Sequence, residues 1–164
     1  MTLSEIAETL REIRVSPVKS LGQNFLHDQN LVRWIVDQVD LGPTDFVIEI
    51  GPGLGALTEL LAAKAGGLLA LEKDKRLVEF LRARLKSGHL EVRHMDAMDF
   101  DVRGLYAKAN VKLVANLPYY LASQLLMKFL KWPSPISLSV LMLQREMAQR
   151  LTASPGDAGN REAL

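Results

Sequence analysis

Five consecutive residues, 116–120, combine hydrogen-bond acceptors with flat aromatic rings. The Asn116 side chain offers an acceptor, and Pro118 stiffens the turn and leaves carbonyl oxygens free to point into a site. Tyr119 adds a ring on which a planar base can stack. This set suits the amine of an adenine, because hydrogen bonds to fixed acceptors favour the pyramidal amine needed for attack. The alternative is an exposed aromatic turn, and residue types alone do not decide between the two.

A second candidate site lies earlier, where Gly51, Gly53 and Gly55 directly precede a helical pattern. Glycines let a ligand lie against the main chain at a helix N-terminus. Glu72 follows about 20 residues later, the spacing at which a carboxylate accepts the two hydroxyls of a ribose. The combination predicts an adenosine-type ligand without saying which one, because Gly51, Gly53 and Ala56 also fit the dinucleotide-binding fingerprint.

A further acidic residue, Asp96, follows the third predicted strand. Its carboxylate either accepts a hydrogen bond from an adenine amine or caps a turn. Like Glu72 and Asn116, it stands directly after a strand, so the elements that carry these residues decide whether they meet.

Apolar β-prone runs alternate with helical patterns from residue 46 onward. Strands are expected at residues 46–50, 68–71, 90–94, 111–115 and 136–143, and helices at 2–14, 28–39, 56–65, 77–85, 122–130 and 144–151. This alternation predicts a doubly wound α/β fold with a mostly parallel sheet, because parallel neighbours need a crossover helix. In such sheets ligands bind beyond the carboxyl ends of the strands, where the candidate residues stand.

The composition is that of one globular domain: 164 residues, 18.2 kDa, 48% hydrophobic and 24% charged. The net charge of +1 gives no argument for or against a nucleic-acid partner. The absence of cysteine excludes disulfides, thiolate zinc sites and cysteine nucleophiles, and it fits a reducing cytoplasm. With no membrane span and no export signal in the sequence, a cytoplasmic protein without a membrane partner is expected. His27, His89 and His94 lack metal-ligand spacing, so no metal is expected.

Four motifs occur in order along the chain: LGQNFL at residues 21–26, EIGPGLGALT at 49–58, LEKD at 71–74 and NLPYY at 116–120. In this order and spacing they resemble the KsgA-type small-subunit ribosomal RNA adenine dimethyltransferases. That family transfers methyl groups from S-adenosyl-L-methionine to the amines of two adjacent adenosines near the 3′ end of the RNA. The resemblance covers nearly the whole chain and implies a Rossmann-like class I methyltransferase fold. Leu54 and Leu117 stand where relatives that methylate large-subunit RNA usually carry Lys and often Ile, which favours the small-subunit branch.

The resemblance also implies roles for particular residues. Contacts with the cofactor are expected from Gln23, Asn24, Leu26, Gly51, Gly53, Glu72, Lys73, Asp96, Ala97 and Asn116. Among them, Glu72 would hold the ribose and Asp96 the cofactor adenine. The catalytic motif is expected at Asn116, Leu117, Pro118 and Tyr119. This motif would polarise the target amine during an in-line displacement at the sulfonium methyl, with no metal and no covalent enzyme intermediate.

The chain is expected to divide into N-terminal helices with a cofactor-covering loop, residues 1–45, and a methyltransferase core, residues 46–164. Members of the family run on further, with two more strands and a small helical RNA-binding domain, so the chain resembles a core truncated after its fifth strand. That strand, residues 136–143, would then be an apolar edge open to self-association. Cofactor binding is expected to survive truncation better than methylation of the expected partner, the ribosomal RNA of immature small subunits.

Three other functions stay open. The first is a binding module: the truncated chain would bind the cofactor and RNA without turning over a substrate. A dinucleotide-dependent oxidoreductase is permitted by the glycine turn, although it gives no reason for Asn116, Pro118 and Tyr119. A small-molecule methyltransferase is the third.

A basic run begins at the LEKD motif and continues through the helix that follows. Its members are Lys73, Lys75, Arg76, Arg82, Arg84 and Lys86. Such a run is usually a solvated helix face, and a grip on RNA phosphates is the alternative.

Overall fold

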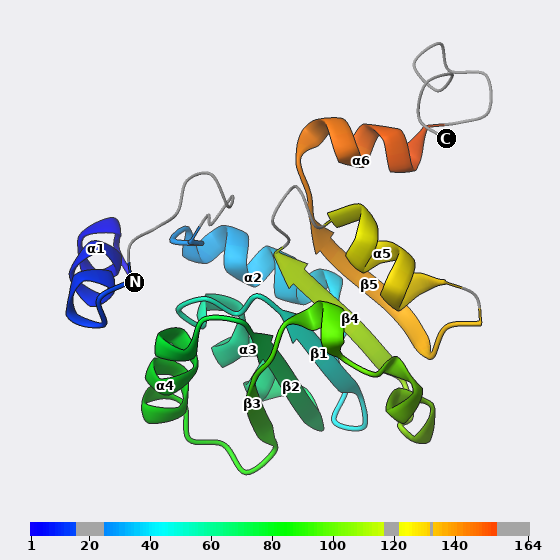
Figure 1. Ribbon diagram of the computed structural model, residues 1–164, viewed down its shortest axis with the longest axis horizontal. Coiled ribbons are helices and arrows are strands. Elements are labelled where there is room, and N and C mark those ends of the chain that lie inside the picture. The colour runs from blue at the N-terminus through cyan, green and yellow to red at the C-terminus, as the bar shows by residue number, and fades with distance from the viewer. Residues whose placement is uncertain (16–24, 117–121, 132, 154–164) are drawn as a thin grey trace.

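The computed structural model describes residues 1–15, 25–116, 122–131 and 133–153 of the protein. At its centre is a sheet of five parallel strands in the order β3-β2-β1-β4-β5 (Figure 1). The strands are β1 (Phe46–Ile50), β2 (Gly67–Glu72), β3 (Leu90–His94), β4 (Val111–Asn116) and β5 (Ile136–Met142). The predicted doubly wound sheet is confirmed, and each strand lies within about one residue of its predicted bounds.

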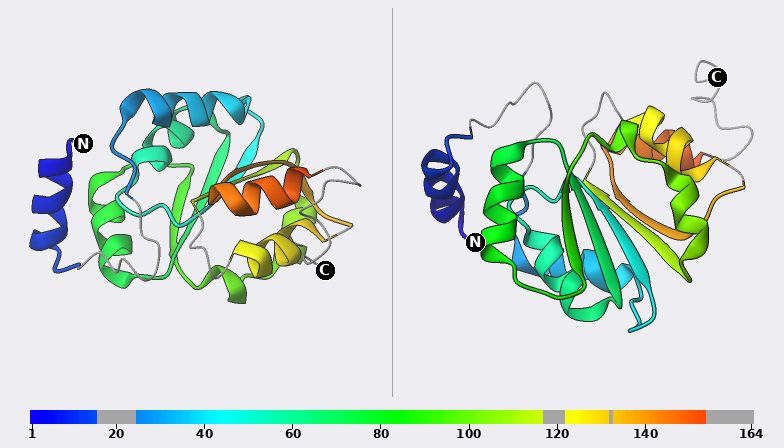
Figure 2. Two further views of the ribbon diagram at one scale, coloured as in Figure 1. Left: turned by 90° about the horizontal axis from the view of Figure 1, so that it is seen from above. Right: turned by 60° about the horizontal axis from the view of Figure 1, so that its bottom comes forward.

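Helices cover both faces of this sheet (Figure 2). The described helices are α1 (Leu3–Glu12), α2 (Gln29–Gln38), α3 (Ala56–Lys64), α4 (Lys75–Arg84), α5 (Ala122–Leu130) and α6 (Arg145–Thr152). Of these, α1 lies apart from the sheet and packs against Leu54 and Leu77. Leu61 of α3 packs with Val47 on one face, and Leu81 of α4 packs on the same face over β2 and β3. Phe129 of α5 packs with Ile48 on the other. Because both faces are covered, the strands are nearly continuous apolar runs.

Side-chain caps set the first helix boundaries. Thr2 and Glu5 form a capping box at the start of α1, in which the Thr2 amide donates to Glu5 Oε2 at 2.7 Å and the Glu5 amide donates to Thr2 Oγ1 at 3.3 Å. Asp28 accepts hydrogen bonds from the amides of Asn30 and Leu31 and begins α2. These caps satisfy amides that have no partner inside the helix, and they confirm the predicted starts of both helices. Within the described ranges, no helix is long and apolar enough to cross a membrane.

Two short 3₁₀ helices between β3 and β4 were not predicted: η2 (Ala97–Asp99) and η3 (Val102–Ala107). The Asp96 side chain accepts from the Met98 amide at 2.9 Å and begins η2, and the Asp101 side chain accepts from the Arg103 amide at 3.0 Å and begins η3. Such short turns carry no helical period of apolar residues, so the hydrophobic pattern does not reveal them.

The strand register brings the carboxyl ends of three strands together. Ile50 of β1 lies opposite Leu71 of β2 and Ala115 of β4. At the opposite end of the sheet, Lys112 Nζ lies 2.8 Å from Asp45 Oδ2, and both side chains are largely buried. This ion pair links β4 to the residue before β1. The candidate site residues lie at the other end of the sheet, at the carboxyl ends of the strands.

Candidate active site

The turn between β1 and α3 has a backbone conformation that favours glycine. Gly51 and Gly53 have φ angles of 72° and 58°, in the left-handed region that side chains disfavour. A Cβ on Gly51 would lie 3.2 Å from the backbone oxygen of Asn116, and a Cβ on Gly53 would lie 3.3 Å from the ring of Phe25. The backbone conformation therefore favours glycine at both positions, and an added side chain would also press on a neighbouring atom at each.

Glu72, the last residue of β2, holds this turn. Its Oε2 accepts a hydrogen bond from the Gly53 amide at 3.2 Å, and its Oε1 accepts one from the Asp74 amide at 2.9 Å. Burial raises the pKa of the Glu72 carboxyl, and backbone hydrogen bonds from Asp74, Gly53 and Lys73 oppose that rise. A carboxylate accepts about four hydrogen bonds, so Glu72 keeps acceptor capacity for a ribose hydroxyl beside these three.

Asp96 lies after β3, beside the end of β2. Its Oδ2 is 2.6 Å from Lys73 Nζ, and its Oδ1 accepts from the Met98 amide. These two interactions hold the pKa of Asp96 below its ordinary value. The turn-capping alternative is thus observed, and a role of Asp96 toward an adenine stays a prediction. The methyl group of Ala97 is packed in the core.

Asn116 ends β4 and lies against the glycine turn. It is partly exposed, and its backbone oxygen is the nearest atom to the Cβ position of Gly51. Leu26 is also described and packs against the cluster formed with α2 and α3. Five predicted site residues lie outside the described ranges: Gln23, Asn24, Leu117, Pro118 and Tyr119.

Glu49 was not singled out from the sequence, although it is a buried charged residue next to the site. It is 2% exposed on β1, and its Oε2 has no hydrogen-bond partner among the described residues. Burial raises the pKa of Glu49 to about 8; the nearby Thr58 hydroxyl lowers this pKa and the charge of Glu72 raises it further. The signal in the sequence was a carboxyl group inside the otherwise apolar run of residues 46–50, which indicates a buried acidic side chain.

Two arginines of the basic run form hydrogen bonds with main-chain oxygens of the protein. Arg82 donates to the backbone oxygen of Val92 on β3 through Nε at 2.9 Å and Nη2 at 2.6 Å. Arg84 donates to the backbone oxygen of Leu54 at 3.1 Å and lies 2.9 Å from Glu59 Oε2. These internal bonds favour a structural role for Arg82 and Arg84 over a grip on phosphates, whereas the side chains of Lys73 and Lys75 are largely exposed.

Two of the histidines contact main-chain carbonyls. His89 Nε2 lies 2.7 Å from the oxygen of Ala62, and His94 Nε2 lies 3.0 Å from the oxygen of Lys73. In the part of the chain that the structure describes, no group of three His, Cys, Asp or Glu residues is placed to hold a metal ion.

Together, the strand order, the glycine turn after β1 and the acidic residue that ends β2 define a Rossmann-like nucleoside-binding domain of the class I methyltransferase type. The residues present fit a cofactor that contains adenosine. The glycine turn brings the main chain sharply into the start of α3, and Glu72 beside it retains acceptor capacity for a ribose hydroxyl.

The chain belongs to the ribosomal RNA adenine dimethylase family, whose model matches residues 16–163. It is 44% identical over 156 residues to the ribosomal RNA small subunit methyltransferase A of Halothermothrix orenii, covering 91% of this chain and 52% of that protein. It is 45% identical over 164 residues to the protein of the same name from Pelotomaculum thermopropionicum, covering 93% and 56%. The chain thus spans about half the length of the curated relatives it matches. The resemblance to the family is confirmed, and the family depends on S-adenosylmethionine.

Solved structures show the same fold. A dimethyladenosine transferase from Plasmodium falciparum is similar with a TM-score of 0.73 and 28% identity, over 84% of this chain and 49% of that one. The 23S rRNA methyltransferase ErmE is similar with a TM-score of 0.68 and 28% identity, over 77% of this chain and 50% of that one. The class I methyltransferase fold is therefore confirmed.

Proposed function

We propose that this chain binds S-adenosylmethionine across the carboxyl ends of β1, β2 and β4. We propose further that the whole protein methylates the exocyclic amines of two adjacent adenosines near the 3′ end of small-subunit ribosomal RNA. One observation carries the proposal: Glu72 is fixed by the Gly53 and Asp74 amides on one side of the glycine turn, while Asn116 lies against Gly51 on the other. A ribose acceptor and an amine acceptor thus flank one turn.

The cofactor supplies a methyl group on a positively charged sulfur. In the proposal, Glu72 accepts hydrogen bonds from the ribose hydroxyls with its remaining lone pairs. Asp96 accepts from the amine of the cofactor adenine, beside Lys73. The glycine turn offers its main chain to the rest of the molecule.

At the target base, the Asn116 side-chain oxygen accepts a hydrogen bond from the adenosine amine. This contact favours the pyramidal amine whose lone pair attacks the methyl carbon, so that an N–C bond forms as the C–S bond breaks. The methylated nitrogen then releases one proton to solvent water. The contributions of Leu117, Pro118 and Tyr119 to this step, as carbonyl acceptors and a stacking ring, are part of the proposal.

The small subunit is the favoured source of the RNA. Relatives named for the small-subunit activity reach 44% and 45% identity over most of this chain. Immature small subunits as the partner and a cytoplasmic location belong to this proposal. So does the division into an N-terminal unit, residues 1–45, and a core, residues 46–164.

Calorimetry with S-adenosylmethionine tests the cofactor half of the proposal. We expect the unsubstituted chain to bind, and we expect Glu72→Ala to weaken binding at least about tenfold, since charged hydrogen bonds contribute about 1.5–3 kcal/mol each. Glu91→Ala, at an exposed position on β3, is the matched control and should bind as the unsubstituted chain does. No binding by the unsubstituted chain would overturn the assignment, and binding of NADH instead would support a dinucleotide enzyme.

A radiolabelled methyl-transfer assay on immature small subunits tests the catalytic half. We expect Asn116→Ala to abolish transfer and Asn30→Ala, at an exposed position on α2, to leave it unchanged. If the unsubstituted chain binds the cofactor but transfers nothing, the alternative of a binding fragment without turnover is supported for this chain.

We also propose that the edge of β5 self-associates. Among the described strands, β5 pairs with β4 alone, and Leu138 on it is 37% exposed. An apolar edge strand offers unpaired backbone groups to a second copy. Sedimentation should show oligomers that grow with concentration and that Leu138→Lys reduces, whereas Leu3→Lys on α1 should not; a strictly monomeric profile would oppose the proposal.

A further inference from the structure

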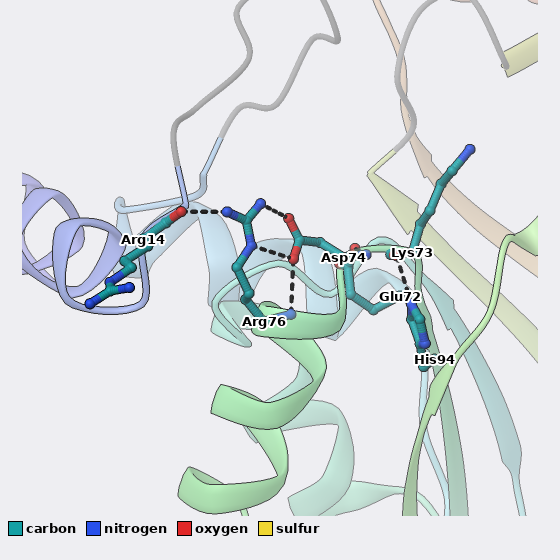
Figure 3. A network of polar contacts seen from close by, with 6 residues as sticks. All are labelled: Arg14, Glu72, Lys73, Asp74, Arg76 and His94. Carbon is teal, nitrogen blue, oxygen red and sulfur yellow. Dashed lines mark hydrogen bonds and ion pairs between the residues drawn. The ribbon is translucent and has the colours of Figure 1, made fainter.

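The end of α1 is built so that one backbone carbonyl points away from the helix. The Arg14 amide donates to the oxygen of Arg11 at 3.1 Å, and the Val15 amide donates to the oxygen of Leu10 at 2.8 Å. Arg14 itself has a φ of 55°. This is a Schellman motif with an arginine in the left-handed position that glycine usually takes. The Arg14 carbonyl accepts a hydrogen bond from Arg76 Nη1 (Figure 3).

Arg76 holds Asp74 at the same time. Its Nη2 lies 2.5 Å from Asp74 Oδ2, and its Nε donates to Asp74 Oδ1 at 3.0 Å. The backbone amide of Asp74 in turn donates to Glu72 Oε1 (Figure 3). A continuous set of polar contacts therefore runs from the end of α1, through Arg76 and Asp74, to the carboxylate proposed to hold the ribose.

An apolar cluster also joins α1 to the glycine turn and to α4. Leu10 of α1 and Val15 are buried with Leu54 of the glycine turn and Leu77 of α4. Phe25 packs against this cluster, and its ring lies against Gly53. The end of α1 thus packs on the glycine turn at Leu54 and on α4 at Leu77, the two elements between which Glu72 lies.

We propose that Arg76 is a positioning residue for the nucleoside site, which fixes the turn from Glu72 to Asp74 by binding the Arg14 carbonyl and the Asp74 carboxylate at once. The inference rests on the proposed function, because it takes Glu72 as the ribose acceptor. By reciprocity, if docking of α1 orders Glu72 for the cofactor, the cofactor strengthens the docking of α1 by the same factor.

The contact requires an arginine. A planar guanidinium offers five donors in a fixed fork and reaches two acceptors in different directions, whereas the ammonium group of lysine is a single point on a flexible stem. Arg76→Lys therefore keeps the positive charge but cannot bind the Arg14 carbonyl and the Asp74 carboxylate at the same time. Arg103 provides the matched control, since it makes the same contacts with Asp101 two residues before it, with Nη2 2.7 Å from Oδ2, but lies 85% exposed at the start of η3.

The experiment compares the unsubstituted chain, Arg76→Lys, Arg76→Gln and Arg103→Lys. Calorimetry gives the Kd for S-adenosylmethionine, and amide hydrogen exchange of residues 3–12 is followed with and without the cofactor. We expect both Arg76 variants to raise the Kd at least about fivefold and to lose the slowing of α1 exchange by the cofactor, in the range usual for coupled sites. Arg103→Lys should match the unsubstituted chain in both measurements.

The outcomes separate positioning from a structural role. Faster α1 exchange in the Arg76 variants with an unchanged Kd would mean that Arg76 only holds the helix, and would overturn the inference while leaving the proposed function intact. An unsubstituted chain whose α1 exchange is indifferent to bound cofactor would do the same. A chain that does not bind the cofactor at all would overturn the proposed function and this inference with it.

Discussion

Gly51 and Asn116 are in backbone contact: a Cβ added to Gly51 would stand 3.2 Å from the Asn116 oxygen. The two residues come from different motifs, 65 positions apart along the chain by their numbers. Their contact follows from the pairing of β1 with β4. It places the start of the proposed catalytic motif directly against the turn proposed to receive the cofactor, so a change at one residue should be felt at the other.

Gly51→Ala should disturb both stability and binding. The new methyl group meets the Asn116 oxygen, and the φ of 72° is strained for any residue with a side chain. A residue held in such a conformation destabilises the folded protein by about 1–3 kcal/mol. We expect the free energy of unfolding in urea to fall by about that amount and the Kd for S-adenosylmethionine to rise at least about tenfold. Gly88→Ala is the control, because nothing lies within 4 Å of its Cβ position; equal losses from both substitutions would contradict the argument.

Glu49 should make the protein less stable as the pH rises. The pKa of its buried carboxyl is about 8, against an ordinary value of 4.5. Between these values the folded protein holds a proton that the unfolded chain releases, so the free energy of unfolding falls with rising pH across this window and levels off above it. Glu49→Gln removes this titration and should flatten the dependence between about pH 5 and 8.

Urea unfolding at several pH values in that window measures the effect. Glu8→Gln, at an exposed position on α1, is the control and should keep the slope of the unsubstituted chain. If Glu49→Gln kept the same slope as well, the pH dependence would have to come from other groups.

The strands and most helices could be predicted because their signals are local. Parallel strands buried on both faces are apolar runs between polar turns, as residues 46–50 show, and Asp28 marks the start of α2 by a capping preference. The 3₁₀ helices η2 and η3 escaped prediction because a single short turn has no period to detect.

The site was predictable where its residues follow strands. Gly51, Glu72 and Asn116 were singled out by their position, and the parallel sheet brings them together. Arg76 was visible only as part of a basic run, since its partner is a carbonyl 62 residues earlier in the chain. Phe25 was not singled out for the same reason: its contact with Gly53 depends on the fold and leaves no pattern in the sequence.

Lys112→Ala should destabilise the protein without touching the cofactor. Lys112 and Asp45 form an ion pair with side chains only 12% and 8% exposed, at the end of the sheet opposite the site. Removal of one partner leaves a buried unpaired charge, which costs about 3–5 kcal/mol. We expect urea unfolding to show a loss of this order and calorimetry to show an unchanged Kd for S-adenosylmethionine.

The exposed pair of Lys64 and Asp37 supplies the comparison. Its N–O distance is also 2.8 Å, but the side chains are 49% and 63% exposed. Lys64→Ala should therefore cost no more than about 1 kcal/mol. Similar losses from the two lysine substitutions would show that burial does not set the strength of the Asp45 pair.

Arg14→Gly should slow hydrogen exchange across α1. Glycine adopts the φ of 55° without the strain of about 1–2 kcal/mol that a side chain brings, and the carbonyl that Arg76 binds is retained. Arg11→Gly, inside the last turn of the same helix, should do the opposite, because glycine in a helix interior loses about 1 kcal/mol relative to alanine. If Arg14→Gly instead sped up exchange, the Arg14 side chain would stabilise the docked helix by more than the strained φ angle destabilises it. The hydrogen bond to the Arg14 carbonyl alone would then not explain how α1 is held.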